Sequence, residues 1–174
     1  IFLMNDSNSL VSVVINCYNS QKYLKETIFS VINQSYKNFE LVIIDNCSID
    51  KTKEIIFSFN DNRIKYFSTV KNINLSSARN FALDNCNGEY IAFLDSDDCW
   101  LENKLKIQID FLEKNLSYGG TFSNCFLMDF KSKNLGTYIK KFKKGSYCFS
   151  DLFRDYIVNL QTFVVRSKIL NKNK

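Results

Sequence analysis

The chain has 174 residues, 45% hydrophobic and 15% aromatic, which excludes a disordered polypeptide and suffices for one domain with a packed core. The formal net charge is +5, and no apolar run is long enough to span a bilayer. The sequence contains no His, which excludes a Ser-His-Asp or Cys-His nucleophile.

The six cysteines are scattered, and none forms a C-x-x-C pair. Without His, this distribution argues against a zinc site. Since the first residues do not resemble a secretion signal, we expect reduced thiols in a cytosolic protein, most of them small packing residues. The first residue is Ile rather than Met, which suggests a fragment of a longer protein.

The first third of the chain alternates strand and helix patterns. Residues 10–16 are rich in β-branched residues and predict a strand, and residues 20–34 carry apolar side chains at helical spacing. Residues 39–45 predict a second strand. Ser48 and Asp50 then offer caps for a helix that reaches about residue 58.

The alternation continues toward the middle of the chain. Residues 63–67 predict a short strand, and Ser76 or Ser77 opens a helix that ends near residue 85. The apolar run over 90–94 predicts a strand that is buried on both faces, as in a parallel sheet.

An amphipathic helix is predicted over residues 100–114, with Asp98 as a candidate cap. The pattern is weaker beyond it. There we expect a strand over 119–130, a β-ribbon over 137–147, a short helix over 149–156 and a last strand over 161–166.

Strands that alternate with helices predict an α/β fold with a mostly parallel sheet flanked by helices. We expect one domain over residues 1–174. Its regular βα units fill residues 10–115, and residues 116–174 are less regular and more basic.

The strand over 90–94 ends in the acidic run Asp95-Ser96-Asp97-Asp98. The two-residue period of a strand predicts that Asp95 and Asp97 point to one side, where Mg²⁺ or Mn²⁺ would offset their repulsion. Ligands bind at this carboxyl edge of open sheets. The alternative is structural, because Asp and Ser also form turns and cap helices.

Several segments in order resemble family 2 glycosyltransferases of the GT-A fold. They are Val11–Asn19, Ser30–Tyr36, Glu40–Asp45, Ser77–Asn80 and Gly88–Asp98, followed by Trp100 and the Lys104-Leu105 pair. The resemblance covers about residues 10–115, which it implies are the nucleotide-sugar-binding part, and residues 116–174 are then expected to begin a truncated acceptor-side part. It implies an inverting enzyme that uses a nucleotide sugar, with an acidic D-x-D site and Mn²⁺ or Mg²⁺ as cofactor.

The resemblance also implies roles for single residues. Asn16 and Tyr18 should border the nucleotide base, and Asp45 should accept hydrogen bonds from the base or ribose. Asn16 stands where the family usually has Pro, and Tyr18 has packing as an alternative role.

Arg79 should lie near the nucleotide and the acidic run, where pairing with Asp95 or Asp97 is an alternative or additional role. Asp95 should approach the ribose or metal, and Asp97 should ligate the metal that bridges the diphosphate. Two departures from the family are Asn46, where a second Asp is frequent, and Asn74, where Gly is usual. We expect Asn74 to keep the turn by tolerating left-handed backbone.

The reaction implied is sugar transfer, from a UDP-sugar in our reading, to a saccharide or lipid-linked acceptor of cell-surface polysaccharide synthesis. We identify no catalytic base and expect it beyond Lys174. For the later acids Asp129, Asp151 and Asp155 we favour surface or capping roles. The alternatives are a non-catalytic nucleotide-sugar-binding domain and a sugar nucleotidyltransferase. The second lacks its usual Gly-rich opening loop.

The late lysines account for much of the net charge. The simplest interpretation is a solvated basic face. The functional alternative is peripheral contact with anionic lipid or a phosphorylated acceptor, at the inner face of the membrane of a cytoplasmic enzyme. No motif supports nucleic-acid binding.

Overall fold

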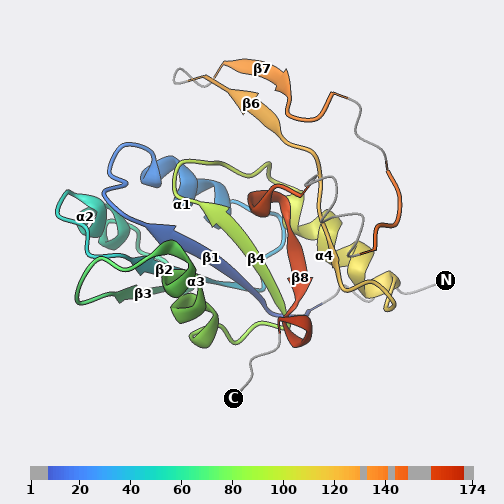
Figure 1. Cartoon of the computed structure of the whole chain (residues 1–174), viewed down its shortest axis with the longest axis horizontal. Coiled ribbons are helices and arrows are strands. Elements are labelled where there is room, and N and C mark those ends of the chain that lie inside the picture. Colours follow the sequence, from blue (N-terminus) through green and yellow to red (C-terminus); the bar gives the residue numbers. More distant parts are fainter. Residues whose placement is uncertain (1–7, 130–132, 141–143, 149–157, 171–174) are drawn as a thin grey trace.

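The computed structural model describes residues 8–129, 133–140, 144–148 and 158–170. A six-stranded sheet has the order β3-β2-β1-β4-β8-β5, and β6 and β7 form a separate two-stranded hairpin (Figure 1). The strands are β1 (Val11–Cys17), β2 (Phe39–Asp45), β3 (Ile64–Ser68), β4 (Tyr90–Asp95), β5 (Gly120–Thr121), β6 (Phe126–Met128), β7 (Asn134–Thr137) and β8 (Val164–Arg166). The helices are α1 (Leu24–Ile32), α2 (Thr52–Phe57), α3 (Leu75–Asp84) and α4 (Lys104–Lys114), with 3-10 turns η1 (Leu160–Thr162) and η2 (Ser167–Ile169).

The sheet is parallel from β3 through β4 and antiparallel beyond it. β1 pairs with both β2 and β4 in parallel, whereas β8 pairs antiparallel with β4 and with β5. The predicted α/β fold with a mostly parallel sheet is therefore confirmed. The helix connections bring the carboxyl ends of β1, β2 and β4 to one edge.

Two apolar layers enclose the sheet. On one face, α1, α2 and α4 cover the odd-numbered positions of β1, and Leu24, Ile28 and Leu105 are fully buried there. On the other face, α3 places Ala78 and Ala82 against the even-numbered positions. Because helices cover both faces of the sheet, the sequences of the central strands are continuously apolar rather than alternating.

The amino edge of the sheet holds a buried carboxylate. Glu40 is 4% exposed and accepts hydrogen bonds from Ser12 Oγ, Lys65 Nζ and the Asn87 main-chain N–H. Burial opposes its ionisation, but these donors outweigh burial and lower the pKa of Glu40. Gly88 donates its N–H to Ser12 Oγ, and an added Cβ there would lie 2.4 Å from Ser12 N.

Several helix boundaries differ from the sequence prediction. Asn74, rather than Ser76 or Ser77, caps α3: its side chain accepts from Ser77 N, and its backbone is extended, not left-handed. Asp50 accepts the N–H of Thr52, the first residue of α2, whereas Ser48 Oγ binds Asn19 N instead.

The prediction that a helix begins near Trp100 with Asp98 as its cap is wrong. α4 begins at Lys104, and the Trp100 main-chain N–H donates to Ser30 Oγ at 3.1 Å. The Trp100 ring is buried, and its Nε1 donates to Gln161 O. This tryptophan therefore fixes the loop before α4 rather than the helix itself.

The region after residue 115 is also rearranged. The strand predicted over 119–130 is divided between β5, in the main sheet, and β6, in the hairpin. The predicted ribbon lies earlier than residues 137–147, and the last strand begins only at Val164 because η1 precedes it. The helix predicted over 149–156 lies outside the described residues.

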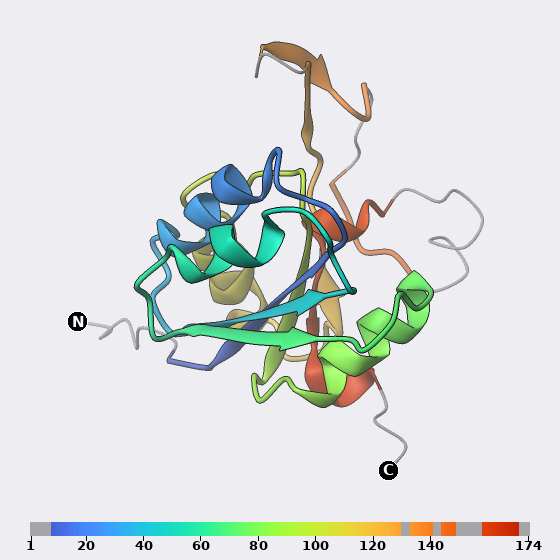
Figure 2. The ribbon, with the colours of Figure 1, turned by 90° about the vertical axis from the view of Figure 1, so that its left-hand side faces the viewer.

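The hairpin of β6 and β7 stands away from the body of the molecule (Figure 2). None of the helices within the described ranges has the length and apolar character that crossing a bilayer requires. None of the six cysteines, all of which lie in the described ranges, forms a disulfide; Cys17 and Cys86 pack in the core as predicted, whereas Cys99 and Cys148 are exposed.

Candidate functional site

Three adjacent strands deliver polar side chains to the carboxyl edge of the sheet. In the parallel register Asn16 lies opposite Asp95, and Cys17 lies opposite Asp45. Asn16 and Asp95 therefore share the face covered by α3, and Asp45 lies on the other face. Parallel strands with helical crossovers bring these residues together although they are far apart in sequence.

The acidic run begins at the end of β4 and continues as a turn. β4 ends at Asp95, and the N–H of Asp98 donates to the Asp95 carbonyl at 3.2 Å. The two-residue strand period therefore does not extend to Asp97, contrary to our expectation. The turn is tied to α1 and its preceding loop through Ser96, whose carbonyl accepts from Thr27 Oγ1 and whose Oγ lies 2.8 Å from Ser20 Oγ.

The charges of this acidic loop, residues 95–98, interact strongly. Arg79 of α3 reaches it, with Nη2 3.5 Å from Asp95 Oδ1. Burial and the charge of Asp97 raise the pKa of Asp95, while Arg79 opposes the shift. Burial, followed by the charges of Asp97 and Asp95, raises the pKa of Asp98 to about 6. The single positive charge of Arg79 therefore does not balance the three carboxylates of the acidic loop.

The donor set fits a hard divalent cation. Asp95 and Asp97 offer carboxylate oxygens, and Mg²⁺ is usually held by one or two carboxylates together with substrate phosphates. Within the described ranges, no group of three or more His, Cys, Asp or Glu side chains is arranged to hold a metal by itself. The loop suits a cation that also draws ligands from a bound diphosphate.

The loop after β1 combines a buried amide with an exposed ring. Asn16 Oδ1 is buried and has no hydrogen-bond partner among the described residues, and Tyr18 is 52% exposed. The exposed ring does not support the packing alternative for Tyr18. Asn19 adopts a positive φ of 51°, accepts the N–H of Ile49 on Oδ1 and so joins this loop to the one after β2.

Asp45 ends β2 as a buried carboxylate, only 3% exposed. Oδ1 accepts the N–H of Ser48 at 2.9 Å, and Oδ2 accepts the hydroxyl of Tyr66 at 3.0 Å. Burial and this hydrogen bond raise the pKa of Tyr66 to about 12. The carboxylate is thus fixed by β3 and by its own loop.

Asn46 has a role that the sequence did not reveal. Its Nδ2 donates to the Ile73 carbonyl at 2.7 Å, and its Oδ1 accepts the Ile73 N–H and the hydroxyl of Thr69. An amide can both donate and accept here, whereas a carboxylate could not donate. The departure from Asp therefore fastens the segment that leads into α3 and Arg79.

Lys104 packs against Trp100 rather than against the acidic loop. Its Nζ is buried, 3.7 Å from the centroid of the Trp100 ring, and burial holds the pKa of Lys104 well below its usual value. Of the later acids, Asp129 lies at the hairpin, where its carboxylate accepts the N–H of Lys133. Asp151 and Asp155 lie outside the described residues.

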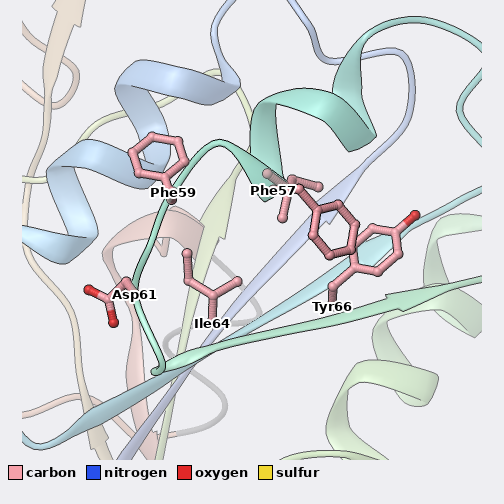
Figure 3. A pocket seen from close by; sticks show the side chains of 6 residues that line it. Phe57, Phe59, Asp61, Ile64 and Tyr66 are labelled. Carbon is pink, nitrogen blue, oxygen red and sulfur yellow. The ribbon is translucent and has the colours of Figure 1, made fainter.

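A separate cavity of about 340 Å³ lies between α2 and β3 (Figure 3). Its lining is mostly apolar: Ile56, Phe57, Phe59, Asp61, Ile64 and Tyr66. None of the predicted site residues lines it. Tyr66 alone connects it with the strand-end residues, because its hydroxyl binds Asp45 and its ring packs edge-on against Phe57.

Comparison with known proteins identifies the architecture. The sequence profile of glycosyl transferase family 2 matches residues 12–170. The crystal structure of S. aureus TarS 1-349 superposes with a TM-score of 0.76 at 26% identity, over 94% of this chain and 48% of that one. The same TarS fragment in complex with UDP-GlcNAc gives a TM-score of 0.75. The predicted GT-A fold is confirmed.

Two relatives are similar in sequence. TuaG of Bacillus subtilis (strain 168), named as a candidate teichuronic acid biosynthesis glycosyltransferase, is 33% identical over 93% of this chain and 64% of TuaG. WfgD of Escherichia coli, named as a UDP-Glc:alpha-D-GlcNAc-diphosphoundecaprenol beta-1,3-glucosyltransferase, is 42% identical over 61% of this chain and 42% of WfgD. The chain thus spans less than two thirds of either relative. Because the family profile covers nearly all of the described fold, the chain belongs to glycosyl transferase family 2.

Proposed function

We propose that this chain binds a nucleoside diphosphate sugar and transfers the sugar, with inversion, to a saccharide or lipid-linked acceptor. The observation that carries the proposal is the acidic loop at the end of β4, with Arg79 3.5 Å from Asp95, in a chain of this family. UDP is the nucleotide we favour, because the similar TarS structure is described in complex with UDP-GlcNAc.

The strand-end residues take the donor in a defined order. Asn16 and Tyr18 border the base, and Asp45 accepts a hydrogen bond from the base or ribose. Arg79 and Asp95 lie toward the ribose and diphosphate, and Asp97 is the metal ligand. The fixed carboxylates and the anchored Ser96 turn keep these groups in place before the donor binds.

When bound, Mn²⁺ or Mg²⁺ would act as a Lewis acid toward the departing diphosphate. Arg79 adds a second positive charge on the same side, where negative charge grows as the bond from the sugar breaks. The acceptor oxygen forms the new bond from the opposite face, and its proton passes to a base. Asp95 and Asp97 would thus hold the cation near the leaving group, and neither serves as the nucleophile.

The acceptor belongs to the finer part of the proposal. The similarity to WfgD, whose name specifies a diphosphoundecaprenol acceptor, favours a lipid-linked saccharide of cell-surface polysaccharide synthesis. We place the reaction at the cytoplasmic face of the membrane, with peripheral contact by the basic region after residue 115.

Calorimetric titration of the purified protein with a panel of nucleotides and nucleotide sugars, with and without Mn²⁺, tests the donor site. We expect Mn²⁺-dependent binding of UDP or of another nucleoside diphosphate. Absence of binding to every member of the panel would overturn the proposal. Pyrophosphate release from a nucleoside triphosphate and a sugar phosphate would instead identify a nucleotidyltransferase.

A further inference from the structure

The β6–β7 hairpin exposes several large apolar side chains close together in sequence. We define the projecting hairpin as residues 124–129 and 133–140. It is closed by main-chain pairing of β6 with β7 and by Asn124, which donates to and accepts from the main chain of Ile139. Five large side chains on it are between 45% and 61% exposed: Phe126, Leu127, Met128, Leu135 and Tyr138.

Both sides of the hairpin are apolar. Because successive strand residues point to opposite sides, Phe126 and Leu127 lie on opposite sides of β6, and an irregularity in the pairing follows between Leu127 and Met128. All three are about half exposed, so the body of the protein covers neither side. A rigid protein partner would bury one side, whereas the interfacial region of a bilayer surrounds an inserted element. The two-sided exposure favours a lipid surface.

The charge of the chain is concentrated in the same segment. Residues 124–148 contain six lysines and one aspartate, so their formal charge of +5 equals that of the whole chain. Outside this segment basic and acidic residues balance. Lys133 and Lys140, which belong to the hairpin, and Lys144, which follows it, are exposed. Apolar side chains flanked by lysines are the combination that binds anionic membranes.

The base of the hairpin is linked through η1 to the loop that follows the acidic loop. Asn159, next to η1, donates to Cys125 Sγ at 3.7 Å, and Gln161 in η1 accepts the Nε1–H of Trp100 on its carbonyl at 2.8 Å. The hairpin projects from the side of the sheet toward which β4 points (Figure 1). A bilayer that contacts β6 and β7 would therefore face the carboxyl edge of the sheet.

We propose that the projecting hairpin docks the protein on an anionic lipid bilayer, with Leu127 and Leu135 entering the interface and the lysines contacting phosphate headgroups. The benefit for catalysis rests on the proposed transfer to a lipid-linked acceptor, but the docking itself does not. It presents the acidic loop to substrates that stay in the membrane.

Co-sedimentation of the purified protein with vesicles tests this docking. The vesicles contain phosphatidylcholine alone or with phosphatidylglycerol. We expect binding only with phosphatidylglycerol, weakened by high salt. Lys133→Glu/Lys140→Glu should lower the partition coefficient at least tenfold, because each neighbouring lysine contributes roughly fivefold. The matched control, Lys25→Glu/Lys53→Glu, changes the net charge equally on exposed helical positions and should stay within about twofold.

The apolar contribution is tested by Leu127→Ser/Leu135→Ser, which leaves the net charge unchanged, against Leu101→Ser/Ile107→Ser at exposed positions before and on α4. Only the hairpin variant should lose vesicle binding, and UDP titration of the same preparations should be unchanged. Equal binding by hairpin and control variants would overturn the proposal. The proposal would also be overturned if sedimentation velocity showed that the hairpin variant no longer forms an oligomer of the parent while it still binds vesicles. Vesicle binding without nucleotide binding would contradict only the proposed transfer.

Discussion

The hydroxyl of Tyr66 lies 3.0 Å from Oδ2 of Asp45, so β3 holds the carboxylate that ends β2. Asp45 is almost fully buried, and this hydroxyl is one of two donors that keep it in place. The contact joins an edge strand to the proposed base-binding position. The orientation of Asp45 therefore depends on a residue that does not itself lie at the carboxyl edge.

Tyr66→Phe should lower the stability by about 1–2 kcal/mol, because it leaves a buried carboxylate oxygen without its donor. We also expect weaker UDP binding. Urea unfolding and calorimetry measure the two effects, with Tyr138→Phe on the exposed hairpin as the control. Unchanged stability and affinity would show that Asp45 does not need this hydroxyl.

Asp97→Ala should abolish the Mn²⁺-dependent part of nucleotide binding. Asp97 is exposed in a turn at the sheet edge, so its loss should change the stability by less than about 0.5 kcal/mol. Calorimetry with and without Mn²⁺, combined with circular dichroism, measures both. Glu102→Ala removes an exposed acid from the following loop and should bind as the parent does. Equal metal-dependent affinity in both variants contradicts the assignment of Asp97.

Asp98→Asn should stabilise the protein at neutral pH but not at pH 4. The pKa of Asp98 is raised to about 6 in the folded state. As the pH falls, the folded state therefore binds this proton near pH 6, whereas the unfolded state binds it only near pH 4. The parent therefore gains stability as the pH falls from about 6 to 4, and lacks that gain above pH 6. After allowance for solvent screening, we expect about 1–2 kcal/mol at pH 7.5.

Thermal unfolding of the Asp98→Asn variant and the parent between pH 4 and 7.5 provides the measurement. The control is Glu102→Gln, which removes an exposed carboxylate that lies outside the acidic loop. A stability difference that is constant over this pH range, or equal in the two variants, would show that Asp98 carries no special ionisation.

Gly88→Ala should destabilise the fold by about 1–3 kcal/mol or more, because the added Cβ would lie 2.4 Å from Ser12 N, a main-chain atom. Gly145→Ala adds the same group where nothing lies within 4 Å and should be nearly neutral. Denaturant midpoints compare the two. Similar midpoints would mean that the β1–β4 connection adjusts more readily than its close contact indicates.

The regular part of the fold could be predicted because local signals and burial agree there. Residues 39–45 were predicted as a strand with the observed bounds of β2, and β1 is displaced by one residue. The prediction is wrong where contacts between residues distant in sequence determine the start of a helix or strand. α4 begins after Trp100 because the Trp100 ring donates to Gln161 and its main chain donates to Ser30. No local sequence pattern reveals these partners.

The candidate site could be predicted only as a set of positions. The strand ends located Asp45 and Asp95 at one edge of the sheet, on the two strands that flank β1, and the resemblance to the family suggested Arg79. The sequence did not reveal that Asn46 fastens the segment before α3, because its departure from Asp looked like a loss. It also did not reveal the turn at Asp97, since strand periodicity gives no sign of where a strand ends.

The antiparallel position of β8 bears on the order in which the chain folds. β1 through β4 form a contiguous parallel unit from the first part of the chain, and β8 is added later against β4. During synthesis, N-terminal segments emerge first, so the four-stranded unit can collapse before Val164 leaves the ribosome. Pairing of Ala92 with Val164 must then await a long loop closure, which is entropically slow. Until that step, the outer edge of β4 remains an open template for association with other chains.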